Sequence, residues 1–230
     1  MNKELIVVIG AYGSGKSEYS INLARMKNEQ GENVALADLD VVNPYFRSRD
    51  VRDKFAKEGI EVIAPEGEFS HADLPMLSPK IRAAIADRNK TVILDVGGDP
   101  AGCRTLGRFR KLIAERGYRM LQVINTKRPF TSNKEEIIKM KEDMEFISKL
   151  KVTEFICNSN LMEYTTEEIV AEGVNTVEDT AKEVNVKFEN YLVLDQHALK
   201  VPDGIACKNR IVLSYFLNKP WEQPKIMKVI

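Results

Sequence analysis

Residues 10–17 form the segment of the chain whose types and spacing have the clearest chemistry. They read Gly-Ala-Tyr-Gly-Ser-Gly-Lys-Ser and match the pattern G-x-x-x-x-G-K-[S/T] in full. The apolar run at residues 5–9 precedes them and predicts a buried strand, and the residues that follow predict a helix. Gly13 and Gly15 allow the backbone to bend so that successive N–H groups point at one anion. This segment, called the phosphate loop below, therefore predicts a binding site for nucleotide phosphates.

Two side chains at the end of the phosphate loop add the charge and the metal ligand that a nucleotide site needs. Lys16 is placed to reach the β and γ phosphates, and the hydroxyl of Ser17 is placed to bind Mg²⁺. The helix predicted over residues 17–30 begins here, and its N-terminus adds partial positive charge. The residues of the loop expected to hold the nucleotide are Gly10, Gly13, Ser14, Gly15, Lys16 and Ser17.

Acidic residues follow two of the predicted strands, where a magnesium–nucleotide site needs carboxylates. Asp95 begins Asp-Val-Gly-Gly, a D-x-x-G pattern in which the N–H of Gly98 is placed to sense the γ phosphate. An acidic residue directly after Val-Ile-Leu is costly unless it has a task. Asp40 is the candidate for orienting the attacking water or for holding a metal-bound water. For Asp38, two residues before Asp40, a structural role as a strand-end cap or in a salt bridge is as good an explanation as a role in the site.

Strand patterns alternate with helix patterns along the chain, which is typical of a mostly parallel sheet with helices on both faces. Strands are predicted over residues 5–9, 34–39, 60–64, 91–95, 120–124, 152–157 and 191–194. Helices are predicted over residues 17–30, 48–58 and 104–116, from 78, from 132 to about 150, from 165, and over 210–217. The sequence thus predicts a single P-loop NTPase domain over residues 1–230, with a three-layer α/β/α fold. Ligands of such folds bind beyond the carboxyl ends of the strands.

The composition narrows the class of protein. The 230 residues are 43% hydrophobic, which is enough for a packed core and excludes a disordered chain. Lys plus Arg and Asp plus Glu each count 34, so the balance argues against broad capture of nucleic acid or of an anionic membrane. No apolar run is long enough to span a bilayer, and the three cysteines have no C-x-x-C spacing. A cytoplasmic protein is the expectation.

Three segments together resemble the MinD/ParA-like ATPases. They are the phosphate loop, Asp-Val-Val-Asn-Pro at residues 40–44, and Leu-Asp-Val-Gly-Gly-Asp-Pro-Ala-Gly at residues 94–102. These ATPases belong to a class of P-loop proteins that also includes nitrogenase iron protein, signal recognition GTPases and dethiobiotin synthetase. The resemblance covers most of the chain in the expected order. It implies that Asp40 is the first switch aspartate, Asp95 the Walker B aspartate and Asn158 the residue that pairs with adenine.

The choice of base depends on two segments at strand ends. A carboxamide at Asn158 suits bidentate hydrogen bonding of a purine edge, and a turn residue in Asn-Ser-Asn is nearly as good an explanation. Residues 125–128, Asn-Thr-Lys-Arg, are a rival base-reading segment, superficially similar to the N-K-x-D motif of GTPases. They lack the acidic residue that grips guanine, so ATP is favoured over GTP.

One position departs from the resemblance. Ala11 stands where MinD and ParA proteins carry a second, signature lysine, and Tyr12 stands where glycine is usual. That lysine reaches across a nucleotide sandwich dimer, so a homodimer of this kind and its activation in trans stay open. The phosphate loop is equally similar to that of P-loop kinases.

Two groups of basic residues follow the loops expected to respond to nucleotide. They are Arg47, Arg49 and Arg52, and Arg104, Arg108 and Lys111. The second group has the i, i+4, i+7 spacing of one helix face. An acidic partner, a phosphorylated acceptor or an arginine finger would each use such charge, and a solvated helix face is favoured over them.

The remaining candidates are assigned structural roles. Cys103 follows the Asp95 segment as a cysteine does in nitrogenase iron protein, but no second cysteine completes a ligand set, so a small buried thiol is predicted. His71 and His197 have no acidic or serine partner at a telling spacing and are predicted to lie on the surface. Trp221 is predicted to pack on the domain near the chain end.

The leading hypothesis is a Mg-ATP-dependent ATPase that acts as a switch on a protein partner. Lys16 and Ser17 hold phosphate and metal, Asp40 positions water, and Asp95 supports the magnesium shell. The alternatives are an ATP-dependent small-molecule kinase or ligase on the same scaffold and a sensor that binds ATP or ADP without turnover. The pathway, and a choice between hydrolysis and phosphoryl transfer, stay open.

Overall fold

The computed structural model describes residues 3–39, 54–63, 79–98 and 100–217. Its centre is one eight-stranded sheet with the order β3-β2-β4-β1-β5-β6-β7-β8. The strands are β1 (Leu5–Gly10), β2 (Val34–Asp38), β3 (Glu61–Ile63), β4 (Thr91–Asp95), β5 (Arg119–Ile124), β6 (Glu154–Cys157), β7 (Lys187–Leu194) and β8 (Asn209–Leu213). Every neighbouring pair is parallel. The mostly parallel sheet predicted from the alternating patterns is therefore confirmed.

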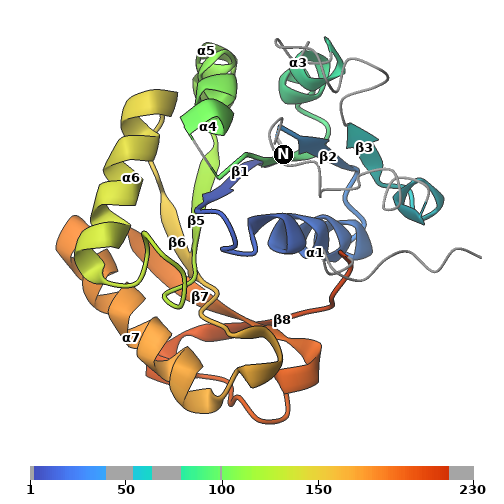
Figure 1. Cartoon of the computed structure of the whole chain (residues 1–230). Coiled ribbons are helices and arrows are strands. Elements are labelled where there is room, and N and C mark those ends of the chain that lie inside the picture. Colours follow the sequence, from blue (N-terminus) through green and yellow to red (C-terminus); the bar gives the residue numbers. More distant parts are fainter. Residues whose placement is uncertain (1–2, 40–53, 64–78, 99, 218–230) are drawn as a thin grey trace, which may run out of the picture.

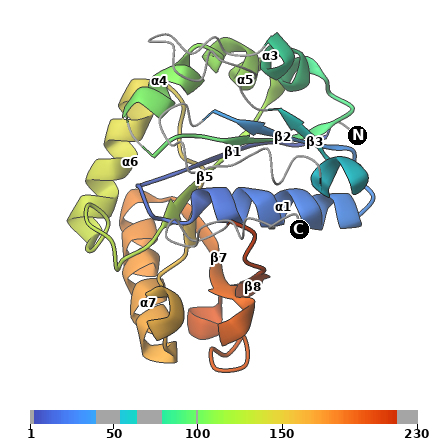
Figure 2. The same ribbon diagram turned by 45° about the vertical axis from the view of Figure 1, so that its right-hand side comes forward.

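Helices cover both faces of this sheet, as Figures 1 and 2 show. They are α1 (Lys16–Glu29), α3 (Pro79–Ala86), α4 (Pro100–Gly107), α5 (Arg110–Arg116), α6 (Lys134–Ser148) and α7 (Glu167–Val184), with residues 54–57 also helical. Buried side chains of α1 pack with one set of strand residues, and those of α3 to α7 pack with the opposite set. Strands β1, β2 and β4 are buried along their whole length because both of their faces are covered. The three-layer α/β/α fold is the one predicted.

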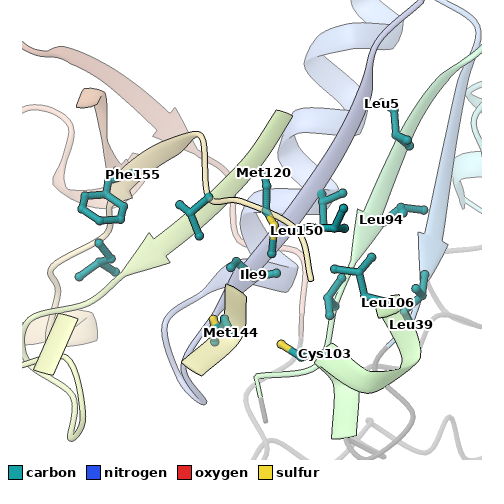
Figure 3. Packing of buried hydrophobic residues seen from close by; sticks show 14 of the residues in the cluster. Leu5, Ile9, Leu39, Leu94, Cys103, Leu106, Met120, Met144, Leu150 and Phe155 are labelled. Carbon is teal, nitrogen blue, oxygen red and sulfur yellow. The ribbon is translucent and has the colours of Figure 1, made fainter. Parts of the chain in front are cut away.

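The larger core lies between the sheet and helices α3 to α7. Figure 3 shows Cys103 of α4 among Leu106, Met144 and Ile9 in this core. Cys103 is 1% exposed, which confirms the buried thiol predicted for it.

Two predicted helices differ from the structure. The helix predicted over residues 104–116 is two helices, because α4 ends at Gly107 and α5 begins at Arg110. Gly107 sits close to α6, where an added Cβ would lie 3.6 Å from the Ile147 carbonyl oxygen, and the turn that follows tightens through a bond from Phe109 N to Leu106 O. The break also separates Arg104 and Arg108 from Lys111, so these cations do not share one helix face.

The helix predicted over residues 210–217 is wrong: the segment begins with strand β8, paired in parallel with β7. The run Ile211-Val-Leu213 is apolar and β-branched at two positions, and such side chains suit a strand. The N-caps of two helices lie one residue after the starts predicted at residues 132 and 165. Asn133 caps α6 and Thr166 caps α7.

None of the helices in the described part of the chain combines the length and the apolar character that crossing a membrane demands.

Candidate functional site

The phosphate loop joins the end of β1 to the start of α1, in the middle of the sheet's carboxyl edge (Figure 1). Gly13 and Gly15 have φ angles of 75° and 85°, a region that residues with a Cβ rarely adopt. Gly15 precedes the first residue of α1 as its N-cap, so the first N–H groups of the helix point into the loop. The loop therefore has the strand–loop–helix context that phosphate binding requires.

The cation Lys16 and the expected Mg²⁺ ligand Ser17 lie in the first turn of α1. Lys16 is only 4% exposed, and Ser17 is half-buried. One turn later, the Ser20 hydroxyl lies 2.9 Å from the Lys16 carbonyl oxygen and 3.3 Å from Oδ1 of Asp95. Ser20 thus connects the start of α1 to the end of β4. No local sequence pattern predicts this connection, because it joins residues on two different elements.

Gly98 packs directly on the phosphate loop. A Cβ at Gly98 would lie 2.7 Å from the Gly10 carbonyl oxygen and 2.9 Å from the Tyr12 backbone nitrogen. These distances are shorter than real Cβ contacts, so only glycine allows the chain after β4 to approach the loop this closely. The segment after Asp95 is therefore mechanically coupled to the loop.

Two acidic residues stand side by side at the ends of neighbouring strands. Asp38 of β2 is the register partner of Asp95 of β4, and the two side chains are 5% and 0% exposed. The Leu39 N–H donates to the Asp95 carbonyl oxygen at 2.8 Å, which fixes this corner of the sheet. The predicted water-positioning residue Asp40 lies outside the described residues, as do Arg47, Arg49 and Arg52.

The donor set at this corner fits Mg²⁺. Carboxylate and hydroxyl oxygens are the ligands that Mg²⁺ prefers, and it takes only one or two of them from protein when phosphates supply the rest. Ser17 and Asp95 provide a hydroxyl and a carboxylate of this kind, with Asp38 adjacent. Within the described residues no group of three or more His, Cys, Asp or Glu side chains forms an all-protein metal cage.

Asn158 lies against the phosphate loop from the end of β6. Its Nδ2 donates to the Ser14 carbonyl oxygen at 2.7 Å, and a Cβ at Gly15 would lie 2.2 Å from the same nitrogen. Its backbone N–H donates to the Ile124 carbonyl oxygen of β5. Within the described chain the Oδ1 of Asn158 accepts no hydrogen bond. The structure thus brings Asn158, which is 7% exposed, to the loop with its Nδ2 engaged and its Oδ1 without a partner among the described residues.

Asn125, the carboxamide of the rival base-reading segment, is engaged by contacts within the protein. Asn125 is fully buried, and its Oδ1 accepts from the N–H groups of Lys127 and Asn160. Its Nδ2 donates to the Asn160 carbonyl oxygen, so the carboxamide joins the loops after β5 and β6. This carboxamide is structural, which removes it from the candidates for reading a base.

Glu18 is a buried carboxylate that sequence reasoning did not single out. It accepts backbone hydrogen bonds from Phe216 at 2.6 Å and from Leu217 at 3.2 Å, while Asn22 exchanges two bonds with the backbone of Ser214. Burial raises the pKa of Glu18 to about 7, and the two N–H donors oppose that rise. The chain after β8 is therefore fastened along α1 by helix side chains.

The surface position predicted for the two histidines can be compared with the structure only at His197. His197 is 5% exposed and its Nε2 lies 2.8 Å from the Met162 carbonyl oxygen, so the surface position predicted for it is wrong. The turn Asp195–His197 after β7 folds inward toward the segment after β6, and this long-range contact has no local sequence signal. His71 and Trp221 lie outside the described residues.

Comparison with solved structures finds similar folds among FtsY proteins. Cell division protein FtsY from Thermotoga maritima is 20% identical with a TM-score of 0.58, over 83% of this chain and 62% of that one. Chloroplast FtsY from Physcomitrella patens is 17% identical with a TM-score of 0.56, over 83% and 58%. The signal recognition particle receptor FtsY from Elizabethkingia anophelis, in complex with GDP, is 15% identical with a TM-score of 0.57, over 84% and 58%.

These likenesses concern the fold. The chain matches about three-fifths of the length of each of these FtsY structures, at identities of 20% or less. No family model matches the chain, and no curated protein matches it either. The α/β P-loop NTPase fold expected from the sequence is thereby confirmed, and the finer MinD/ParA-like resemblance stays a proposal.

Proposed function

We propose that this protein binds Mg-ATP and hydrolyses it slowly, as a nucleotide-dependent switch on a protein partner. One observation carries the proposal: the phosphate loop and the Asp95 carboxylate meet through Ser20 at the carboxyl edge of the sheet. A phosphate-binding backbone and a metal-supporting carboxylate are the two parts that phosphoryl chemistry needs in one place.

The proposed roles follow from these positions. Backbone N–H groups of the loop and the ammonium of Lys16 bind the phosphates, and the hydroxyl of Ser17 binds the metal. Asp95 orients the water shell of the metal, and Asp40 orients the attacking water. Mg²⁺, when bound, offsets charge on the phosphates and holds them in one geometry. The N–H of Gly98 senses whether a γ phosphate is present.

The contact between Gly98 and the phosphate loop supports a switch. Because Gly98 already touches the backbone of Gly10 and Tyr12, a γ phosphate seated in the loop changes the space available to the segment after β4. That segment leads within two residues into α4 at Pro100. A change at the phosphate is in this way passed to a helix on the outside of the molecule.

The proposed base is adenine. A carboxylate is the group that grips the N1–H and N2–H of guanine, and the segments 125–128 and 158–161 at the ends of β5 and β6 carry none. The Oδ1 of Asn158, which has no partner among the described residues, is suited to accept from the adenine amino group. The GDP in the Elizabethkingia structure makes GTP the competing nucleotide in any test.

Exposed aromatic side chains in the segments that follow β1, β5 and β6 support a protein partner. Tyr12 in the phosphate loop, Phe130 after β5 and Tyr164 after β6 are 72%, 71% and 75% exposed. Large exposed aromatics are typical of protein interfaces, where such rings contribute strongly to binding. A partner that binds Tyr12 would contact the nucleotide site itself.

The test is single-turnover release of phosphate from Mg-ATP and from Mg-GTP by the purified protein. Slow release with ATP that Lys16→Ala abolishes is the expected result. Lys139→Ala is the matched control, because it removes an exposed lysine from α6 on another part of the surface. Absence of binding to either nucleotide would overturn the proposal. Tight ATP binding without release favours the kinase, ligase or sensor alternatives, and a screen for phosphorylated acceptors then separates them.

A further inference from the structure

Arg128 lies directly over the phosphate loop. A Cβ built on Gly13 would be 3.2 Å from Nε of Arg128, 3.5 Å from Cδ and 3.6 Å from Cζ. The guanidinium end of the side chain is therefore in contact range of the Gly13 backbone. Both residues are exposed, so this side of the loop is open to a ligand.

The backbone that carries Arg128 is held in place by the buried polar contacts after β5. Its N–H donates to the Asn125 carbonyl oxygen at 3.1 Å, and the Thr131 hydroxyl donates to the same oxygen at 2.8 Å. Pro129 follows and restricts the conformations of the preceding residue. The backbone that carries the side chain is thus fixed by the fold, which reduces the entropy lost when Arg128 binds a ligand.

The charge of Arg128 is not used within the described protein. Its side chain makes no hydrogen bond or ion pair with any residue in the described ranges, whereas its neighbour Lys127 is paired with Glu172 at 2.8 Å. The phosphate loop itself supplies one cation, Lys16, because Ala11 and Tyr12 carry no charge. A nucleoside triphosphate carries several negative charges, so the site has room for a second cation.

We propose that Arg128 binds the phosphates of the nucleotide as a second cation provided by the same chain. This inference rests on the proposed function and adds a binding residue to its site. Arginine suits the role because its planar fork donates two parallel hydrogen bonds to phosphate oxygens. Its contribution grows with the number of phosphates on the nucleotide, since the attraction is to their charge.

The experiment measures dissociation constants of ATP, ADP and adenosine, with Mg²⁺, for four proteins. These are the wild type, Arg128→Ala, Arg128→Lys and Arg88→Ala. Arg88 is the matched control because it is an exposed arginine in the turn before β4, at the opposite edge of the sheet. Arg128→Ala is expected to weaken ATP binding about tenfold, ADP binding less and adenosine binding not at all. Arg128→Lys restores part of the loss, and Arg88→Ala binds as the wild type does.

A second measurement follows the chemical accessibility of Arg128 in the wild-type protein. Phenylglyoxal labels exposed arginines, and mass spectrometry reports the labelling rate at each one. Mg-ATP is expected to slow labelling at Arg128 at least fivefold and to leave Arg88 unchanged.

The outcomes separate the inference from the function on which it rests. ATP binding that Lys16→Ala abolishes and Arg128→Ala leaves intact, with no protection of Arg128, overturns the inference alone. Equal losses for ATP and adenosine also overturn it, because they indicate a contact with the base or sugar. A wild-type protein that binds no nucleotide overturns both.

Discussion

The two edges of the parallel sheet use polar residues in opposite ways. At the amino edge, charged side chains pair with one another. Arg119 of β5 binds both carboxylate oxygens of Glu154 at 2.7 and 2.8 Å and reaches Glu4 at 3.1 Å, and Lys27 of α1 binds Glu4 at 2.6 Å. Arg116 of α5 donates there to backbone carbonyl oxygens, including those of Ala84, Ile85, Lys3 and Glu4.

At the carboxyl edge, polar side chains are held by backbone and amide groups. Asn158 donates to the Ser14 carbonyl oxygen, and Asn125 exchanges three bonds with the chain around Lys127 and Asn160. Arg128 has no carboxylate partner in the described residues. This edge is organised with neutral carboxamides, and the charge of Arg128 is available to a ligand.

The difference teaches where stability and function lie in this fold. Ion pairs that are satisfied within the protein hold strands together and need no ligand. A protein that gathers cations and carboxylates at one place to bind a ligand is less stable for it, because like charges repel there, and binding sites generally show this trade-off. Substitutions at the two edges should therefore have opposite effects. Those at the carboxyl edge should weaken nucleotide binding more than they lower stability, and those at the amino edge should lower stability without weakening nucleotide binding.

The largest effect is expected at Lys16. Lys16→Ala removes the cation from the phosphate loop and should lower the rate of phosphate release on the order of 1000-fold, the scale measured for the loss of one preorganised donor. Its melting temperature should fall less than that of Arg119→Ala, because the cost of burying the Lys16 ammonium offsets part of what its contacts contribute. Stopped-flow phosphate release and calorimetry measure the two quantities. A variant that melts several degrees lower would show that Lys16 also supports the fold, which would contradict the separation of stability and function between the two edges.

Gly98→Ala is expected to have the next largest effect. The new methyl group would meet the Gly10 carbonyl oxygen at 2.7 Å, which forces the loop or the segment after β4 to move. A displacement of about 1 Å at a catalytic site costs up to roughly 100-fold in rate. Single-turnover phosphate release is the measurement. Gly107→Ala is the control for an added methyl group, since neither glycine has a positive φ and the added Cβ at Gly107 would meet only ordinary contacts of 3.6 Å or more.

The phosphate loop and its neighbouring strands were predictable because their signals are local. The motif, the apolar run before it and the Asp95 pattern each lie within ten residues, and the structure confirms strands and a helix there. The contacts of Asn158 with Ser14 and of Arg128 with Gly13 join residues more than a hundred positions apart, and no periodicity encodes them. The helix wrongly predicted over residues 210–217, where the structure has β8, has the same origin. Ile211-Val-Leu213 is too short a run to separate helix from strand, and its pairing with β7 decides the outcome.

Arg119→Ala should give the reverse profile of Lys16→Ala. It leaves the Glu154 carboxylate, whose side chain is 7% exposed, without its two-pronged partner. Removing one partner of a buried pair costs several kcal/mol, and the partial exposure of Arg119 reduces this to about 2 kcal/mol of unfolding free energy. Chemical denaturation measures the loss. The dissociation constant for Mg-ATP should stay within twofold of the wild-type value, and a larger change would break the separation between the edges.

The smallest effect is the pH dependence of the same pair. The bidentate bond from Arg119 holds the pKa of Glu154 below its usual value, and burial opposes this. A carboxyl whose pKa is lower in the folded state stabilises the fold above its unfolded pKa, near 4.5, and that contribution is lost as the pH falls through the folded value. The unfolding free energy of the wild type should therefore fall more steeply below pH 5 than that of Glu154→Gln, which cannot titrate there. Denaturant titrations between pH 3 and pH 7 compare the two slopes, and parallel curves would mean that other carboxylates govern acid unfolding. Because Glu154 lies at the amino edge, the same substitution should leave the pH profile of nucleotide binding unchanged, which is the most demanding form of the comparison.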